Sequence, residues 1–417
     1  MTVDPRFLVI QYGARHAYGI PLAFSKCQSL AGLYTDLTSQ SLLGRTAKLV
    51  AGWQNNQSIL KRLSRRTLPE EIVPFTKSLI VGATVGEAIT RVPISSFREN
   101  YGNDLSKRMT ELEMKLSGTQ GATHIYTMFG EGGEFISYAK EKGLGIVGDV
   151  YIALSADPIV SEEEQRYPSW CHTPIIEARV EDQRERNKIL LTKSDLLVCP
   201  SEFVRDDLIL NHGVNLERTI VAPYSIDHKW TNLQSAPIPR RILFAGSAIV
   251  RKGIHYFAMA AKGLSRHGYQ FRVAGSASST VRHHKDASEL IFLGHLSSQE
   301  LEDEFRQADV FVFPTLAEGS ASVVTEALGA GIPVVTTHAA GSLVRNGTDG
   351  FIVTERDPSA LIEAIRCIAE NRQLRTSMSE SARIRAQSYS WDDFSQTVIS
   401  ATKSIAGPSR TVVLDNR

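Results

Sequence analysis

The stretch from Asp309 to Val353 constrains the fold of this 417-residue chain more than any other. Val310–Phe313 is a short, wholly apolar run of β-branched and aromatic residues, which is typical of a strand buried on both faces of a parallel sheet. We expect a helix to open at Gly319–Ser320, and Pro333–Thr336 indicates the next buried strand. The pattern therefore predicts a strand–loop–helix–strand unit of a parallel α/β domain.

Two acids in this unit have a spacing that suits a long ligand. Glu318 lies in the loop at the carboxyl end of the first strand, where open α/β sheets bind ligands. Glu326 follows about two helical turns later, so the two carboxylates should be on the order of 10 Å apart. Between them, the amides of Gly319, Ser320 and Ala321 are expected to favour an anion. A nucleotide-sugar fits this pattern; the alternative is a solvent-facing helix residue and an ordinary loop acid.

The residues after the two acids carry a resemblance to a known family. Glu318 and Glu326 are followed by the Gly/Pro-containing run 327–335, by a small-residue loop at 339–342 and by Asp-Gly-Phe at 349–351. This dense pattern resembles the acidic signature of the retaining glycosyltransferases of family GT4. The resemblance implies retention of anomeric configuration and no metal requirement, and the chain contains no Asp-x-Asp motif.

The resemblance also implies a fold class and a division of the chain. It predicts an α/β protein of GT-B architecture, with two Rossmann-like domains whose parallel sheets face each other across a cleft. We expect an acceptor-binding domain at 1–230 and a nucleotide-sugar domain at 231–390. A helix at 391–405 should cross back to the first domain, and 406–417 should form a tail. The Pro-rich stretch 235–240 is the best candidate for the link between the domains.

Short apolar runs that alternate with longer amphipathic stretches support this α/β pattern. In the first domain, strands are predicted at Phe7–Gln11, Gly32–Asp36, Ser78–Gly82, His124–Met128, Gly145–Asp149, Leu196–Cys199 and Thr219–Ala222. In the second, the strands that precede Val310–Phe313 are predicted at Arg241–Ala245, Phe271–Gly275 and Leu290–Leu296.

The loop after the first strand of the second domain resembles the family's diphosphate loop, which reads Gly-Arg-x-x-x-x-Lys-Gly. After the first glycine, Gly246, the residues Lys252 and Gly253 match this pattern, whereas Ser247 stands where the family has arginine. Arg251 could supply the missing charge, because departure of a nucleoside diphosphate builds negative charge that nearby cations stabilise. The alternative is a surface pair of cations. The resemblance further implies that the loop at Leu296 holds the nucleobase, mostly through its backbone.

Candidates for the acceptor side lie in the first domain, at the predicted strand ends. The glycine loop after the first strand faces the cleft in the family, although its polar residues could also be ordinary surface groups. Tyr151 occupies the place of a cleft histidine of the family, and His124, one strand earlier, could substitute or be structural. The acceptor-side candidates are Gly13, Arg15, His16, His124, Asp149 and Tyr151.

Composition excludes several classes of protein. The net charge of +1 gives no sign of nucleic-acid binding, and no run approaches the ~18–20 apolar residues of a membrane span. The four cysteines are scattered singly, which predicts neither a disulfide framework nor a metal site and fits a cytoplasmic protein. Residues 160–194 are strongly charged and are expected to form exposed helix faces.

Residues 37–69 contain no acid and several cations. They could contact anionic lipid at the inner face of a membrane, or an anionic acceptor; the alternative is a solvated helical face. The basic residues are Arg45, Lys48, Lys61, Arg62, Arg65 and Arg66.

These features predict a glycosyltransferase that moves a sugar from a nucleoside-diphosphate sugar to a hydroxyl of a glycan, a lipid-linked glycan or a small molecule, without a cofactor. Arg251 and Lys252 are expected to stabilise the leaving diphosphate, Glu318 to hold the sugar, and Glu326 to bind the ribose hydroxyls. Two alternatives stay open. The substitution at Ser247 gives weight to a non-catalytic, nucleotide-sugar-binding partner subunit, and a nucleotide-sugar 2-epimerase would act on the donor alone.

Overall fold

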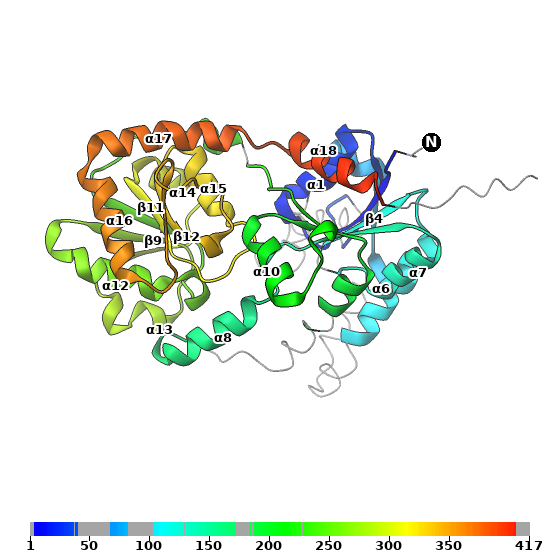
Figure 1. Cartoon of the computed structure of the whole chain (residues 1–417), viewed down its shortest axis with the longest axis horizontal. Coiled ribbons are helices and arrows are strands. Elements are labelled where there is room, and N and C mark those ends of the chain that lie inside the picture. Colours follow the sequence, from blue (N-terminus) through cyan, green and yellow to red (C-terminus); the bar gives the residue numbers. More distant parts are fainter. Residues whose placement is uncertain are drawn as a thin grey trace, which may run out of the picture.

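The chain forms two parallel β-sheets, each covered by helices (Figure 1). The computed structural model describes residues 4–36, 38–40, 67–81, 103–128, 130–171, 184, 187–226 and 228–405. Every strand pair in both sheets is parallel within these residues. The predicted α/β class with two Rossmann-like domains is therefore confirmed.

The first sheet has seven strands in the order β3-β2-β1-β4-β5-β6-β7. Successive residues of its interior strand β1 point to opposite faces, as the period of two requires. Phe7 and Val9 enter the apolar cluster that includes Phe24, whereas Leu8 and Ile10 enter a second cluster on the other face. The strands are β1 (Phe7–Ile10), β2 (Leu30–Thr35), β3 (Thr76–Ser78), β4 (His124–Met128), β5 (Gly145–Asp149), β6 (Leu196–Cys199) and β7 (Thr219–Val221).

One predicted strand of this sheet is misplaced. We expected a strand at Ser78–Gly82, but β3 pairs with β2 from Thr76 to Ser78 and ends there. The next amide, that of Leu79, still donates to Thr35 O, after which the backbone turns into a helical conformation. The observed strand is a short polar edge, so its sequence carries no apolar run.

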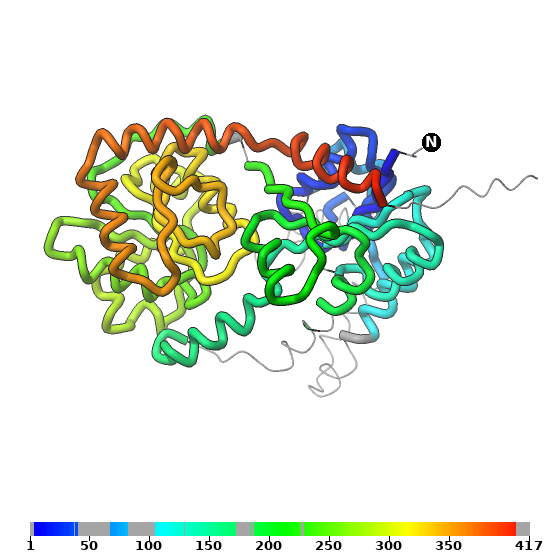
Figure 2. Tube along the Cα trace, viewed as in Figure 1, coloured from blue at the N-terminus to red at the C-terminus, as the bar shows by residue number. Residues whose placement is uncertain are grey.

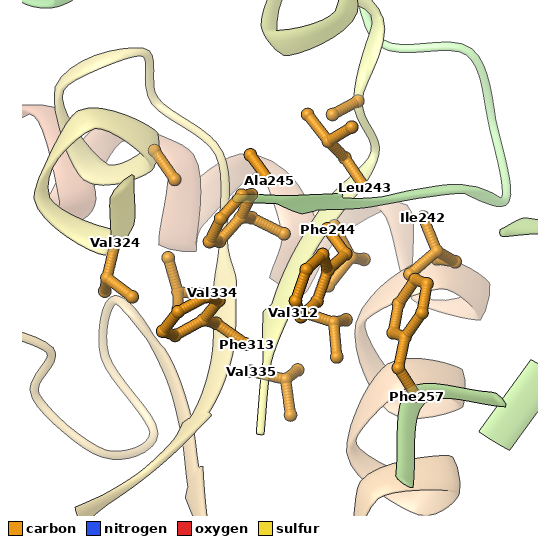
Figure 3. Close-up of a cluster of buried hydrophobic side chains, with 14 of the residues drawn as sticks. Ile242, Leu243, Phe244, Ala245, Phe257, Val312, Phe313, Val324, Val334 and Val335 are labelled. Carbon is orange, nitrogen blue, oxygen red and sulfur yellow. The ribbon is translucent and has the colours of Figure 1, made fainter. Parts of the chain in front are cut away.

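The second sheet has six strands in the order β10-β9-β8-β11-β12-β13. Its central strands are buried on both faces, and Figure 3 shows part of this core around Phe244 and Phe313, whose ring centroids lie 5.5 Å apart. The strands are β8 (Arg241–Ala245), β9 (Gln270–Ala274), β10 (Leu290–Gly294), β11 (Val310–Phe313), β12 (Val334–Thr337) and β13 (Gly350–Val353). The helices of this half are α12 (Ile254–Leu264), α13 (Ser279–Arg282), α14 (Ser298–Gln307), α15 (Ser322–Gly329), α16 (Pro358–Glu370) and α17 (Arg372–Gln387).

The chain crosses from the first core to the second before β8 and returns after α17. Tyr224 packs in the first core, whereas Ile226 and Trp230 already pack in the second, so this crossing lies upstream of the boundary expected after residue 230. On the return, Tyr389 contacts the second core and Trp391 the first. The trace in Figure 2 follows this second passage from the end of α17 into the last helix.

The last helix, α18 (Trp391–Thr402), packs on the first domain as predicted. Phe394 and Val398 are buried in the apolar cluster that contains Phe7 and Phe24. The neighbouring helix α1 (Gly19–Lys26) begins at a glycine that accommodates this contact, because a Cβ on Gly19 would lie 2.4 Å from the Trp391 ring. The other helices of the first half are α6 (Asn103–Ser117), α7 (Glu134–Glu141), α8 (Ala156–Arg166), α10 (Glu202–His212) and, at the crossing, α11 (His228–Thr231).

Candidate functional site

Residues after β8 and β11 form an ion pair at the carboxyl edge of the second sheet. The 3₁₀ turn η6 (Val250–Lys252) carries Arg251, whose guanidinium lies 2.7 Å from Glu318 Oε1. The same guanidinium donates to Ala317 O at 2.7 Å. The Arg251 backbone O accepts from Leu316 N and from Thr315 Oγ1, which fastens the two loops together. The structure thus brings together two residues that the sequence pattern placed in one site.

Lys252 lies against the turn that follows β8. A Cβ on Gly246 would be 3.0 Å from Lys252 Nζ, and the glycine has φ 125°, so a side chain there would be strained. The Lys252 ammonium lies 5.5 Å from the centroid of the Phe313 ring. Burial lowers the pKa of Lys252, the nearby Glu318 carboxylate opposes this shift, and the Arg251 guanidinium adds to it. An anion bound beside Lys252 would therefore stabilise its ammonium form.

Two further donor-side candidates, Ser247 and Leu296, lie in the loops after β8 and β10. Ser247 is exposed, and its Oγ accepts a hydrogen bond from Ser276 Oγ at 3.1 Å. Leu296 is half-buried and packs against the second core. Serine carries no positive charge. The cations described at this carboxyl edge of the second sheet, Arg251 and Lys252, both belong to η6.

The loop between β11 and α15 carries Glu318 and is called the acid loop below. It differs from the helix N-terminus that we expected there. We predicted a helix from Gly319–Ser320 with three amides available to an anion, but α15 begins at Ser322. The amide of Ala321 donates to Ala340 O at 3.0 Å, so it is occupied. The amide of Glu318 likewise donates to Ala339 O at 2.9 Å, because the loop after β12 runs alongside the acid loop. Glu326 lies within α15 and is half-buried, as an acid two turns beyond Glu318 should be.

The acid loop touches the first domain. A Cβ on Gly319 would lie 1.7 Å from the backbone O of Tyr151, so only glycine fits this approach. Ser201 Oγ donates to Gly319 O at 2.5 Å and also accepts from Val204 N, so this serine caps α10 and contacts the second domain as well. The contact with Gly319 was not evident from the sequence, because nothing in the serine's local pattern points to a partner in the other domain.

The glycine loop after β1 is held by two acids that the sequence analysis did not single out. Gly13 N donates to Asp36 Oδ1 at 2.9 Å, and Arg15 pairs with Glu131 Oε1 at 3.1 Å. The Arg15 guanidinium lies over the Tyr151 ring, 4.5 Å from its centroid. Gly13, Arg15 and Tyr151 are thus brought together at the carboxyl ends of β1 and β5, on the side of the acid loop.

His16 lies in a strained turn of the same loop. It has φ 49°, and the next two residues, Ala17 and Tyr18, also have positive φ values of 49° and 62°. Such residues cost about 1–3 kcal/mol each and are often found at functional sites. The His16 ring packs against Tyr224 in a tilted arrangement, with centroids 4.1 Å apart. Desolvation by the surrounding protein atoms lowers the pKa of His16, and the positive charge of Arg15 lowers it further, to about 4. The imidazole is therefore neutral near pH 7.

Asp149 does not face the cleft, in contrast to our expectation. The side chain is fully buried, and its two oxygens accept hydrogen bonds from Tyr126 OH and Tyr224 OH, each at 2.6 Å. Burial raises the pKa of Asp149 to about 6, although the two phenols and Arg15 favour its charged form. Asp149 is linked to the site through Tyr224, against which the His16 ring packs.

His124 is also wrong as a cleft residue. It is the first residue of β4, so it lies at the amino edge of the sheet, about 13 Å from the carboxyl end at roughly 3.3 Å per residue. It is 3 % exposed, and its Nδ1 lies 2.8 Å from Thr123 Oγ1. Burial lowers the pKa of His124. It is a structural histidine, as the alternative interpretation held.

Two further expectations bear on metals and membranes. Within the described ranges, no three His, Cys, Asp or Glu side chains gather in a way that could hold a metal ion. Among the same residues, no helix has the length and apolarity that crossing a membrane would require. The six cations of segment 37–69, from Arg45 to Arg66, lie outside the described residues.

Comparison with known proteins shows which family model this site matches. The family model of glycosyl transferases group 1 matches residues 239–371. Among similar proteins, a D-inositol 3-phosphate glycosyltransferase of Paenarthrobacter aurescens is 29% identical over 219 residues, which are 47% of this chain and 54% of that protein. A glycogen synthase of Mycobacterium tuberculosis is 29% identical over 230 residues, or 52% and 55% of the two chains. The chain thus spans about half the length of these curated relatives.

Solved structures match over almost the whole chain. Anabaena Alr3699/HepE in complex with UDP and glucose has a TM-score of 0.63 at 13% identity, and the match covers 96% of this chain and 100% of that one. Sucrose-phosphate synthase from Thermosynechococcus elongatus has a TM-score of 0.63 at 15% identity, covering 94% and 97%. At such identities the likeness concerns the fold, which is the GT-B arrangement of two Rossmann-like domains. The residues that match the glycosyl transferases group 1 model lie in the second domain.

Proposed function

We propose that this protein is a retaining glycosyltransferase that moves a sugar from a nucleoside-diphosphate sugar to an acceptor hydroxyl. The observation that carries the proposal is the cluster of Arg251, Lys252 and Glu318 at the carboxyl edge of the second sheet. This cluster lies in the part of the chain that matches the family model. The solved Anabaena relative is described in complex with UDP and glucose, which supports a nucleotide-sugar as the donor.

In this proposal the second domain stabilises the leaving group. Cleavage of the bond between the anomeric carbon and the phosphate oxygen builds negative charge on the departing diphosphate. Lys252 and Arg251 stabilise that charge, and Glu318 orients Arg251 and accepts hydrogen bonds from sugar hydroxyls. Gly319 and Ser320 line the donor near the phosphate, and Glu326 binds the ribose. Retention and independence of metal rest on the family resemblance.

The first domain supplies the acceptor side of the proposed reaction. Arg15 and Tyr151 lie opposite the acid loop, and the neutral imidazole of His16 can accept a hydrogen bond from a hydroxyl. The acceptor class proposed is a glycan, a lipid-linked glycan or a small molecule. A contact of segment 37–69 with anionic lipid, at the cytoplasmic face of a membrane, is a separate hypothesis. Vesicle flotation tests it, and equally weak binding to neutral and anionic vesicles would remove it.

A thermal-shift screen against nucleoside diphosphates and their sugar conjugates tests the donor assignment, because a ligand that binds the native state raises Tm. The conjugate that raises Tm then enters a transfer assay with a panel of acceptors. Binding of no diphosphate would overturn the proposal. Binding without transfer would favour a non-catalytic partner subunit, which is the alternative that exposed Ser247 supports. Turnover of the donor without any acceptor would indicate an epimerase.

A further inference from the structure

The segment between β5 and β6 is packed on the other domain. In sequence, α8 and the following turn η4 (Pro168–Trp170) belong to the first domain, yet Trp170 is 3 % exposed within the apolar core of the second. The Trp170 ring stacks on His284 with centroids 4.0 Å apart, and Ser169 Oγ lies 3.0 Å from His284 Nε2. Figure 1 shows α8 extending away from the first sheet to lie beside α13. We expected this charged segment to be an exposed helix face.

One acid of α8 is fully buried in this contact. Glu163 is 0 % exposed, and its Oε1 lies 3.0 Å from His255 Nε2 and accepts a hydrogen bond from Tyr256 OH. Its Oε2 accepts from Arg356 Nε at 2.6 Å, and the neighbouring Glu162 accepts from the same guanidinium at 3.1 Å. Although burial opposes ionisation, hydrogen bonds from His255, Tyr256 and Arg356 lower the pKa of Glu163 to about 2. Glu163 is therefore a buried charge whose partners all come from the second domain.

Two of these partners lie directly beside the diphosphate loop. His255 and Tyr256 belong to the first turn of α12, which starts immediately after Gly253 and the turn that carries Lys252. A Cβ on Gly253 would lie 1.9 Å from the backbone O of Pro314, so the turn is closely packed against the acid loop as well. Helix α8 also contacts η6 itself. The position of Lys252 thus depends on what holds the start of α12.

The other end of α8 leads directly to the acceptor side. The helix begins at Ala156, a few residues after Tyr151, whose ring lies under Arg15 and whose backbone O meets Gly319. The short link between them is fixed to the first domain, because Ser155 N donates to Asp207 Oδ2 at 3.2 Å. The segment from Tyr151 to Glu163 therefore runs from the acceptor side to the contact between α8 and the turn that carries Arg251 and Lys252.

We infer that Glu163 is a positioning residue for the proposed transfer. It holds the first turn of α12 through His255 and Tyr256, and so fixes the cations of η6 at the donor diphosphate relative to Tyr151 on the acceptor side. This inference rests on the proposed function for its effect on catalysis. Its structural part, that α8 orders the diphosphate loop, is independent of any substrate.

Glu163→Gln tests the inference, with Glu162→Gln as the matched control. The first variant keeps the size of the side chain but removes the buried charge, whereas Glu162 is half-exposed and pairs with Arg166 and Arg356 at the surface. In the unliganded protein, amide hydrogen exchange of residues 249–256 should be faster in Glu163→Gln than in Glu162→Gln. Binding of uridine, adenosine and guanosine diphosphates, measured by calorimetry, should weaken, and kcat should fall roughly 10- to 100-fold, as for a displaced catalytic group.

The KM for the acceptor should stay within about twofold of the wild-type value. The acceptor-side loop keeps the contacts of Gly13 with Asp36 and of Arg15 with Glu131, which do not involve Glu163. A purely structural role would instead lower Tm and leave exchange at 249–256, diphosphate binding and kcat of the folded enzyme unchanged, which would overturn the inference. Tyr256→Phe removes the hydrogen bond that the Tyr256 hydroxyl donates to Glu163. This variant replaces Glu163→Gln in the test if Glu163→Gln does not fold. If the wild type binds none of the three diphosphates, the proposed function fails, while the exchange comparison still decides whether α8 orders the loop.

Discussion

At the scale of the residue, the side chain of Lys252 should contribute most to the chemical step. Lys252→Ala is expected to lower kcat roughly 10²–10³-fold, the scale of removing one strong donor that acts on transition-state charge. Lys262→Ala is the control, because that lysine is 69% exposed and pairs with Asp286 on the surface. Steady-state kinetics with saturating donor decide the matter. An unchanged kcat would remove Lys252 from the leaving-group assignment.

The buried carboxyl of Asp149 should make stability depend on pH. Its folded pKa of about 6 lies above the model-peptide value of 3.8, so the native state binds the proton more tightly than the unfolded chain. Its contribution is therefore fully present below about pH 4 and is lost as pH rises through 6, by roughly 3 kcal/mol. Relative to Asp149→Asn, the wild type should gain stability on acidification from pH 7 to 4. Parallel curves of Tm against pH for the two proteins would contradict this.

At the scale of the element, α18 should stabilise the first domain rather than the second. Phe394 is 2 % exposed between α18 and α1, so Phe394→Ala should cost about 3–5 kcal/mol of unfolding free energy. Ile384→Ala on α17 is the control, because that side chain is 67 % exposed and should cost less than about 0.5 kcal/mol. Denaturant unfolding monitored by fluorescence compares them. Equal midpoints would show that α18 adds nothing to the first core.

Sequence predicted the elements whose signal is local. The apolar runs at Val310–Phe313, Arg241–Ala245 and Leu196–Cys199 are strands within the same bounds, because burial on both faces leaves an uninterrupted pattern. The polar edge strand β3 lacks that pattern, so its predicted position was wrong. The predicted start of α15 was also wrong, because carbonyls of the loop after β12, which is remote in sequence, accept hydrogen bonds from the amides of Glu318 and Ala321.

The candidate site was predictable where the residue type itself carries the chemistry. Arg251 and Glu318 meet as the pattern suggested. His124 was misplaced because a polar residue beside an apolar run marks an end of the strand without saying which end. The burial of Asp149 and Glu163 was not predictable, since it depends on tyrosine, histidine and arginine partners that lie far away along the chain.

At the scale of the whole molecule, the contact between the domains should set the geometry of the cleft. Gly319→Ala would place a Cβ 1.7 Å from the backbone O of Tyr151, which cannot be relieved by a side-chain rotation. The domains must separate, so kcat should fall about 100-fold, and small-angle X-ray scattering should show a larger radius of gyration.

Gly263→Ala is the matched control for this change. A Cβ there meets only the end of the Ile362 side chain, and alanine favours the helix in which it lies. This variant should keep wild-type kinetics and scattering. If Gly319→Ala behaves in the same way as the control, the contact with Tyr151 does not control the cleft.

The return of α18 to the first domain also has a consequence for biosynthesis. Phe7 and Phe24 leave the ribosome well before Phe394 and Val398, and the cluster that buries all four is incomplete until the later two follow. At about 5–20 residues per second, that interval lasts roughly 20 to 75 s. Throughout it, the nascent first domain exposes the apolar face that α18 later covers, so chaperones that bind incompletely folded chains should associate with it until α18 emerges.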